Sequence, residues 1–165
     1  MRVRPSFRLD RDPRRHERQE TAVPDVIKLL EQDHREVEDL FSKAESTSGA
    51  ARQQVVTKIA SELTLHTEVE ERFVYPAMRD AGLADLVNEA EQEHAKVKEL
   101  VAQLETIDAT TDDVESLLAE LKADVQHHVQ EEETEAFPKF RESVDQSELQ
   151  SLATRVQEAK QQADA

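Results

Sequence analysis

Four stretches of the chain carry apolar residues at alternating intervals of three and four, and this repetition restricts the fold more than any other feature. Such spacing places the side chains in one stripe along one face of an α-helix. One stripe per helix is the pattern of helices that pack side by side in a bundle. The stripes are Ile27, Leu30, His34, Val37, Phe41 and Ala44; Val56, Ile59, Leu63, His66, Glu70 and Phe73; Leu83, Val87, Ala90, His94, Val97, Val101 and Leu104; and Val114, Leu118, Leu121, Val125, His128 and Glu132.

The connections between these stretches are short. They fall near residues 46–50, at residue 82 and at residues 108–112. The chain has only two glycines and five prolines, too few for a turn-rich β-sandwich. The sequence therefore predicts an all-α protein: an up-down-up-down four-helix bundle with a short extra C-terminal helix and a flexible N-terminal arm.

Local signals predict several helix ends. Pro76 and Pro138 are expected to end or kink the second and fourth helices late in their course. The extra helix is expected from Ser147, in a capping box with Gln150, to about Gln161.

The chain repeats itself, which predicts that the bundle is a duplicated αα-hairpin. A histidine is followed by a glutamate at four and at five residues and by a proline at ten, and this set occurs twice: His66, Glu70, Glu71 and Pro76, then His128, Glu132, Glu133 and Pro138. A further histidine, His34 or His94, precedes each set by 32 or 34 residues. Each half is therefore expected to supply one set of ligands.

Charge divides the chain unevenly. Residues 1–24 contain seven arginines and four acidic residues, a net charge of +3, while the remainder contains 14 basic and 33 acidic residues. We expect a flexible basic arm at 1–24, the four-helix bundle at 25–142, and the C-terminal helix and tail at 143–165. The arm could contact an acidic partner, nucleic acid or the acidic body itself. An overlong start-codon assignment is an equal alternative.

Six titratable residues occupy stripe positions that face the core: His34, His66, Glu70, His94, His128 and Glu132. One core histidine is usually explained by a single hydrogen bond, but a buried carboxylate is costly unless a cation is paired with it. The stripes contain no lysine or arginine, and the chain has no cysteine. Four imidazoles and two carboxylates at mid-bundle therefore predict a metal site with nitrogen and oxygen ligands.

The spacing of these residues favours two metal ions. Residues four apart lie on one helix face, so His66 and Glu70 present an imidazole and a carboxylate side by side, as does the corresponding pair of the second half. Each ion would take two imidazoles, and both glutamates would bridge the ions. Donors without sulfur favour iron or manganese, with zinc as an alternative.

The fourth helix contains two adjacent histidines, and the stripe distinguishes them. His128 continues the apolar stripe, whereas His127 aligns with acidic residues of a polar face. His128 is therefore the predicted ligand, and His127 is expected to be solvated, with contact to a ligand as the minor alternative. Glu71, Glu131 and Glu133 are expected on a solvated face.

These motifs resemble the hemerythrin-like HHE cation-binding family. The resemblance covers about residues 25–142 and rests on His34, His66-x-x-x-Glu70, His94 and His128-x-x-x-Glu132. It implies that these six residues bind metal and that the cofactor is two non-haem iron ions, bridged by carboxylates and by an oxo or hydroxo group. It also implies a protein that handles oxygen or related small molecules.

One position departs from the oxygen-carrying hemerythrins that this chain resembles. Those proteins have a further histidine four residues after the one on the third helix, and here that residue is Lys98. Loss of the imidazole would leave an open position on each iron, which favours turnover of peroxide over oxygen carriage. Whether Tyr75, the only tyrosine, fills such a position stays open. Because it lies off the stripe, Tyr75 is expected to pack near the helix end.

We therefore expect a di-iron protein that binds dioxygen, peroxide or nitric oxide, with catalase- or peroxidase-like turnover as its enzymatic form. The alternatives are a metal- or redox-dependent sensing module without turnover, which would act on a separate protein partner, and delivery of iron to other proteins.

A net charge of −16 argues against nucleic acid as a partner of the acidic body. A monomer is preferred. The lack of long apolar runs and of a secretory segment after Met1 predicts a cytoplasmic protein without membrane contact.

Overall fold

The computed structural model describes residues 24–165, and these residues form helices and no strand. The all-α prediction is therefore confirmed for this part of the chain. The predicted arm at 1–24 lies outside the described residues except for its last residue. The α-helices are α1 (Val26–Glu45), α2 (Gly49–Val69), α3 (Tyr75–Asp80), α4 (Ala84–Thr106), α5 (Val114–Glu131), α6 (Phe137–Ser143) and α7 (Gln146–Ala163), and the π-helical turns are η1 (Glu70–Val74) and η2 (Glu132–Ala136).

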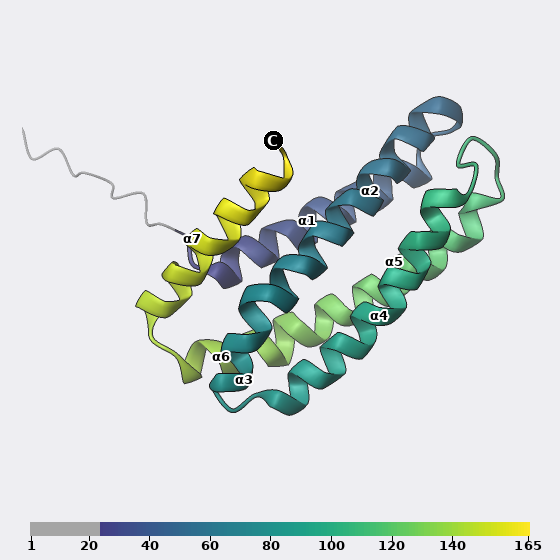
Figure 1. The fold of residues 1–165 in the computed structure, drawn as a ribbon. Helices are drawn as coiled ribbons and strands as arrows, with labels where there is room; N and C mark the ends of the chain where they lie inside the picture. Colours follow the sequence, from purple (N-terminus) through teal and green to yellow (C-terminus); the bar gives the residue numbers. More distant parts are fainter. Residues whose placement is uncertain (1–23) are drawn as a thin grey trace, which may run out of the picture.

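The long helices pack side by side (Figure 1). α1 contacts α2 and α5, and α4 also contacts α2 and α5. The α1–α2 and α4–α5 connections lie at one end of the molecule, and α3 and α6 lie at the other. α7 packs on α1, α2 and η1. None of the helices in residues 24–165 has the length and hydropathy needed to cross a membrane.

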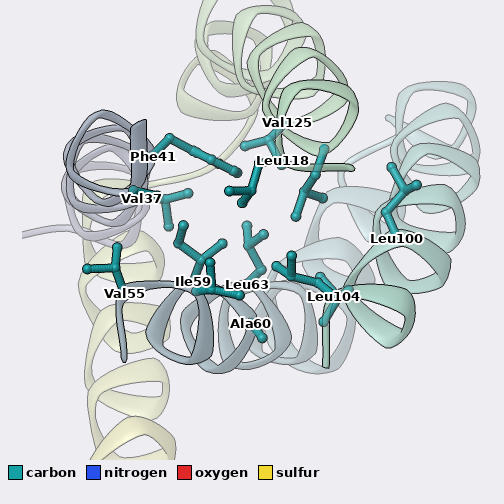
Figure 2. Close-up of a cluster of buried hydrophobic side chains, with 14 of the residues drawn as sticks. Val37, Phe41, Val55, Ile59, Ala60, Leu63, Leu100, Leu104, Leu118 and Val125 are labelled. Atoms are coloured by element: carbon teal, nitrogen blue, oxygen red, sulfur yellow. The ribbon is translucent and has the colours of Figure 1, made fainter. Parts of the chain in front are cut away.

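Two apolar clusters fill the space between the helices. One cluster lies toward the α1–α2 and α4–α5 connections and includes Phe41, Ile59 and Leu104 (Figure 2). The other lies toward α3 and α6 and includes Phe137 and Leu149. Each fully buried side chain of this size contributes about 1.5–3 kcal/mol to folding. The polar positions of the stripes lie between the two clusters and are therefore held by packing on both sides.

The helical geometry changes where the glutamates of the stripes occur. In η1 the N–H of Tyr75 donates to the carbonyl of Glu70, and in η2 the N–H of Phe137 donates to the carbonyl of Glu132. These hydrogen bonds span five residues, so each turn holds one residue more than an α-helical turn. The buried face therefore moves forward by one residue beyond each glutamate.

The predicted stripe position of Phe73 is wrong for this reason. Val74 and Tyr75 are buried in its place. Phe73 is half-buried, and the guanidinium groups of Arg72 and Arg155 each lie 4.9 Å from the centre of its ring. A cation over an aromatic face is a favourable contact. Phe73 therefore helps to fix α7, which carries Arg155, against η1.

The helices do not end at Pro76 and Pro138, one of the two outcomes expected for these residues. The chain stays helical through both prolines, which lie in the first turns of α3 and α6. A proline is tolerated there because amides of a first turn need no partner within their own helix.

α7 begins at Gln146 with Asp145 at its cap, and no side chain bonds to its first amides. Ser147 therefore lies inside the helix, and the predicted capping box is wrong.

Gly82 allows the chain to turn sharply after α3. Its φ is +85°, and the N–H groups of Gly82 and Leu83 donate to the carbonyls of Arg79 and Met78, each over 3.0 Å. We expect Gly82→Ala to lower the free energy of unfolding by about 1 kcal/mol, because a Cβ meets no atom within 4 Å and only the cost of the positive φ remains. Urea unfolding of both chains measures this, and an unchanged midpoint would contradict it.

Candidate metal centre

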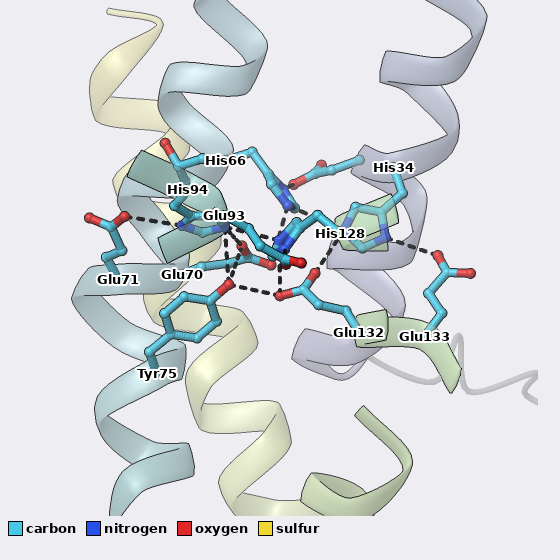
Figure 3. A network of polar contacts seen from close by, with 12 residues as sticks. His34, His66, Glu70, Glu71, Tyr75, Glu93, His94, His128, Glu132 and Glu133 are labelled. Atoms are coloured by element: carbon cyan, nitrogen blue, oxygen red, sulfur yellow. Dashed lines mark hydrogen bonds and ion pairs between the residues drawn. The ribbon is translucent and has the colours of Figure 1, made fainter. Parts of the chain in front are cut away.

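The six predicted ligands meet in one buried layer between the two apolar clusters (Figure 3). α1 and α4 each supply one histidine, while α2 with η1 and α5 with η2 each supply a histidine and a glutamate. None of the six is more than 6% exposed. They are His34, His66, Glu70, His94, His128 and Glu132. The structure thus brings together every residue of the predicted ligand set.

Each glutamate spans histidines from both halves of the chain. Oε1 of Glu70 lies 3.2 Å from His66 Nε2, and its Oε2 lies 3.1 Å from His94 Nε2. Glu132 spans the other two histidines in the same way, at 3.4 and 3.3 Å. The donor atoms form two sets, each of two imidazole nitrogens and two carboxylate oxygens within 4.8 Å of one another. Both glutamates belong to both sets.

A carboxylate on a neighbouring helix holds each histidine from outside the layer. The Nδ1–H groups donate to these carboxylates over 2.6–3.2 Å. The pairs are His34 with Glu133, His66 with Asp33, His94 with Glu71, and His128 with Glu93. Because an imidazole that donates from Nδ1 has only Nε2 left to bind a metal, these contacts direct the four Nε2 atoms into the layer.

The predicted solvated positions of Glu71 and Glu133 are therefore wrong, since both are half-buried and hold a histidine. A signal in the sequence could have identified all four carboxylates. Asp33 and Glu93 directly precede the histidines of α1 and α4, and Glu71 and Glu133 directly follow the two glutamates of the layer. Each carboxylate thus lies beside one predicted ligand in the sequence and holds another predicted ligand in space.

Lysines fix two of these carboxylates in turn. Lys98 Nζ lies 2.6 Å from Glu71 Oε2. Lys160 of α7 contacts both carboxylate oxygens of Asp33. Burial opposes ionisation of Asp33, but hydrogen bonds from His66 and Lys160 outweigh it and lower its pKa. Lys98, at the position of the further histidine of the oxygen carriers, therefore holds the carboxylate that contacts His94, and Lys160 links α7 to the carboxylate that contacts His66.

The adjacent histidines of α5 point in opposite directions. The side chain of His128 is 6% exposed, whereas that of His127 is 64% exposed. Nε2 of His127 lies 3.3 Å from Glu93 Oε1 and 3.2 Å from Glu131 Oε1 at the surface. His127 therefore lies outside the buried layer, as its position off the stripe predicts.

Tyr75 belongs to the layer although the stripes exclude it. Its hydroxyl lies 2.8 Å from Glu132 Oε1, 3.2 Å from Glu70 Oε2 and 3.0 Å from His94 Nε2. The prediction that Tyr75 only packs near the helix end is wrong, and the cause is η1. Because five residues make up this turn, the side chain five positions after Glu70 returns to the same face of the helix.

The second half has no equivalent of this hydroxyl. Phe137 occupies the corresponding position, and its ring stacks on His34 with the ring centres 5.9 Å apart.

We expect Tyr75→Phe to lower the free energy of unfolding of the metal-free protein by about 1.5–3 kcal/mol, because buried Glu132 loses a hydrogen-bond donor. Urea unfolding of the metal-free chains tests this. Equal midpoints would show that the hydroxyl adds nothing to stability.

In the metal-free protein, opposite charges compensate one another in the layer. Burial lowers the pKa of His66, but the charge of Glu70 and hydrogen bonds to carboxylates outweigh it and raise the pKa to about 10. Burial also lowers the pKa of His128, but the charge of Glu132 outweighs it and raises this pKa well above its ordinary value. Burial and the charge of Glu70 oppose ionisation of Glu132, but His128 lowers its pKa to about 2. A metal that binds here must displace protons.

The donor atoms present fit a metal. Glu70 Oε1 and Glu132 Oε2 are buried, and they lie 3.2 and 3.3 Å from a histidine Nε2. A buried carboxylate is costly unless a cation is paired with it, and a coordinated metal would meet that need. Two sets of imidazole and carboxylate donors without sulfur suit iron, manganese or zinc.

A small cavity of about 20 Å³ adjoins the layer. All four histidines line it, and most of its other walls are apolar, formed by Val37, Leu63, Val97, Val125 and Val129. A space of this size holds a molecule about as large as one water.

An all-helical protein with four inward imidazoles and two shared carboxylates is a metal-binding module of the di-iron type. The hemerythrin HHE cation-binding domain matches residues 25–140 of this chain. The chain therefore belongs to the hemerythrin HHE cation-binding family, and the resemblance noted from its motifs is confirmed.

Two known proteins are similar over most of this chain. A hemerythrin HHE cation-binding domain-containing protein from Mycobacterium kansasii has the same fold, with a TM-score of 0.73, 22% identity, and coverage of 84% of this chain and 86% of that one. A DNA nickase from Nostoc sp. is 26% identical over 145 residues, which are 87% of this chain and 40% of the nickase. The chain thus spans less than half the length of the nickase.

Proposed function

We propose that this chain is a non-haem di-iron protein that binds dioxygen, hydrogen peroxide or nitric oxide, with catalase- or peroxidase-like turnover of peroxide as its enzymatic form. We further propose that its ligand-bearing helices form an up-down-up-down four-helix bundle of two related αα-hairpins at 25–142, followed by the C-terminal helix and tail at 143–165. The neighbour contacts of α1, α2, α4 and α5 support this topology.

The single observation that carries the proposal is the pair of donor sets that share both glutamates. Glu70 and Glu132 each present one oxygen to each half of the layer, so each is placed to bridge two ions. Two histidines would complete each set, held by the carboxylates on their Nδ1 atoms. Bound iron would supply redox chemistry and open coordination positions for a small molecule.

The surroundings of the layer support a small, neutral ligand. The cavity beside the histidines is close to the size of one water and mostly apolar, so it favours a small molecule over a larger or charged one. The valines and Leu63 exclude bulk water from this space. Tyr75, with a pKa that burial and the two glutamates raise well above its ordinary value, keeps its proton and donates a hydrogen bond to Glu132.

Metal content and an absorption spectrum test the proposal. We expect about two irons per chain. Absorption bands near the blue edge of the visible spectrum should bleach with dithionite and return with air or peroxide. Zinc or no metal would contradict the oxygen chemistry and leave a structural or partner-binding bundle. Addition of peroxide to the iron-loaded protein then separates turnover from binding, because an enzyme must release oxygen faster than the same amount of free iron.

Two alternatives make different predictions. A sensing module without turnover requires a partner protein whose binding differs between the reduced and oxidised states, so identical pull-downs in both states would count against it. Iron delivery requires release to a chelator, and slow, tight retention would exclude it.

The likeness to a DNA nickase raises nucleic acid as a substrate. Residues 25–165 carry 33 acidic against 14 basic residues, however, and this charge disfavours contact with phosphates.

A further inference from the structure

The duplication gives the molecule two related surfaces, and only one of them is a continuous groove. The groove between α1 and α5 encloses about 310 Å³ and reaches a predicted ligand, His34. The corresponding surface between α2 and α4 is divided into two hollows of about 190 and 440 Å³. Lys98 lines both hollows, and neither hollow reaches a histidine of the layer.

The charged groups that face each other differ between the two surfaces. On the α2–α4 surface the ammonium of Lys98 binds the carboxylate of Glu71 at 2.6–2.7 Å. The residues at the corresponding positions of the α1–α5 groove are Glu38 and Glu133, and both line it. Two carboxylates cannot form such a pair, and Glu133 instead lies 3.6 Å from the guanidinium of Arg35. Ion pairs therefore cross both surfaces, but the α1–α5 groove still reaches a histidine of the layer.

The α1–α5 groove and the cavity beside the metal layer share a wall. His34, Val125 and Val129 line both spaces. Val129 is partly exposed, whereas Thr67, its counterpart in the first half, is only 3% exposed. The 190 Å³ hollow of the α2–α4 surface also shares Leu63, Thr67 and Val97 with the cavity, but these three residues are at most 4% exposed. Val129 is therefore the partly exposed residue among those that border both the cavity and an outer surface.

Because the groove reaches His34 and Val129 is partly exposed in this shared wall, we propose that small neutral ligands reach the metal layer through the α1–α5 groove, and that Val129 sets the size of molecule that passes. The proposal rests on the proposed function, because it concerns access to the same layer. A path limited by one side chain responds to the volume of that side chain, through small rotations that open and close it.

Association of nitric oxide with the iron-loaded, reduced protein tests the route. We expect Val129→Phe to slow association by about tenfold and Val129→Ala to speed it by about threefold. Dissociation should change by the same factors, because ligand leaves by the same path, so the equilibrium affinity stays within about twofold. Iron content and thermal unfolding of each variant show that the layer is intact.

Ala102→Phe is the matched control. Ala102 is exposed and lines a hollow of the α2–α4 surface, so the same ring is added to the opposite side of the molecule. We expect this variant to associate with nitric oxide at the unmodified rate. Equal rates in both Val129 variants, or slowing that occurs only in Ala102→Phe, would overturn the proposal.

A second measurement decides the route without iron. In the metal-free protein under dissolved oxygen, paramagnetic relaxation of methyl protons reports where the gas penetrates. Val97 lines the inner cavity, so we expect its relaxation to fall in Val129→Phe and to stay unchanged in Ala102→Phe. The reverse result would overturn the route. If the iron-loaded protein binds no nitric oxide at all, the proposed function fails, while this measurement still decides the path.

Discussion

Replacement of Glu132 by alanine should abolish binding of two metals by this chain. Glu132 is 2% exposed and belongs to both donor sets, so its loss removes one oxygen ligand from each half of the layer at once. Removal of a single bridging ligand should weaken occupancy of both positions by at least about 100-fold. Glu70→Ala should have the same effect, because Glu70 is shared in the same way.

The measurement is the metal-to-protein ratio after loading with ferrous iron and removal of excess metal. His127→Ala is the matched control, because His127 is adjacent to a predicted ligand but 64% exposed, and it should keep the unmodified ratio. Glu132→Gln keeps the shape of the side chain and separates loss of the ligand from loss of the fold. Equal losses in all of these variants would show that the ligand set is wrong.

The metal-free protein should be most stable between about pH 4.5 and 6.5. The pKa of His66 is raised from 6.5 to about 10, so its protonated form stabilises the fold fully below 6.5, and this contribution is lost as the pH rises toward 10. The pKa of Glu132 is lowered from 4.5 to about 2, so its contribution is present above 4.5 and is lost as the pH falls toward 2. The alkaline loss should be roughly 3–5 kcal/mol.

Urea unfolding from pH 3 to 10 measures this profile. Chains loaded with metal should not show the alkaline loss, because each imidazole then binds metal through the atom that would hold the proton. The comparison also removes the effect of the general rise in negative charge with pH. A metal-free protein whose stability is constant or rises between pH 6.5 and 10 would contradict the prediction.

The regular helices could be predicted from the sequence because spacing alone determines which face is buried. His128 follows Val125 on the stripe and is buried, while His127 lies one position away and is exposed. The internal repeat then placed Glu132 opposite Glu70. Neither inference needs knowledge of how the helices contact one another.

Other features depend on contacts between helices, and spacing cannot supply them. The stripes assume an α-helix without interruption, so they misplaced Phe73 and left Tyr75 outside the layer, although the five-residue turn brings it to both glutamates. Glu71 and Glu133 hold histidines of other helices, which only the packing of those helices determines. The capping box at Ser147 failed because α7 already begins at Gln146, so Ser147 lies inside the first turn of the helix.

The π-helical turns also determine where the length of such a chain can vary. Loss of one residue from an α-helical turn rotates everything that follows by about 100°, whereas a π-helical turn can lose its extra residue and become an α-helical turn while the faces on either side stay aligned. The two halves of this chain differ in length at another place. The interval from His66 to Pro76 equals that from His128 to Pro138, whereas the connection between the long helices is residues 46–48 in the first half and residues 107–113 in the second. The halves therefore match in the segments that carry the predicted ligands and differ in the loops far from the layer.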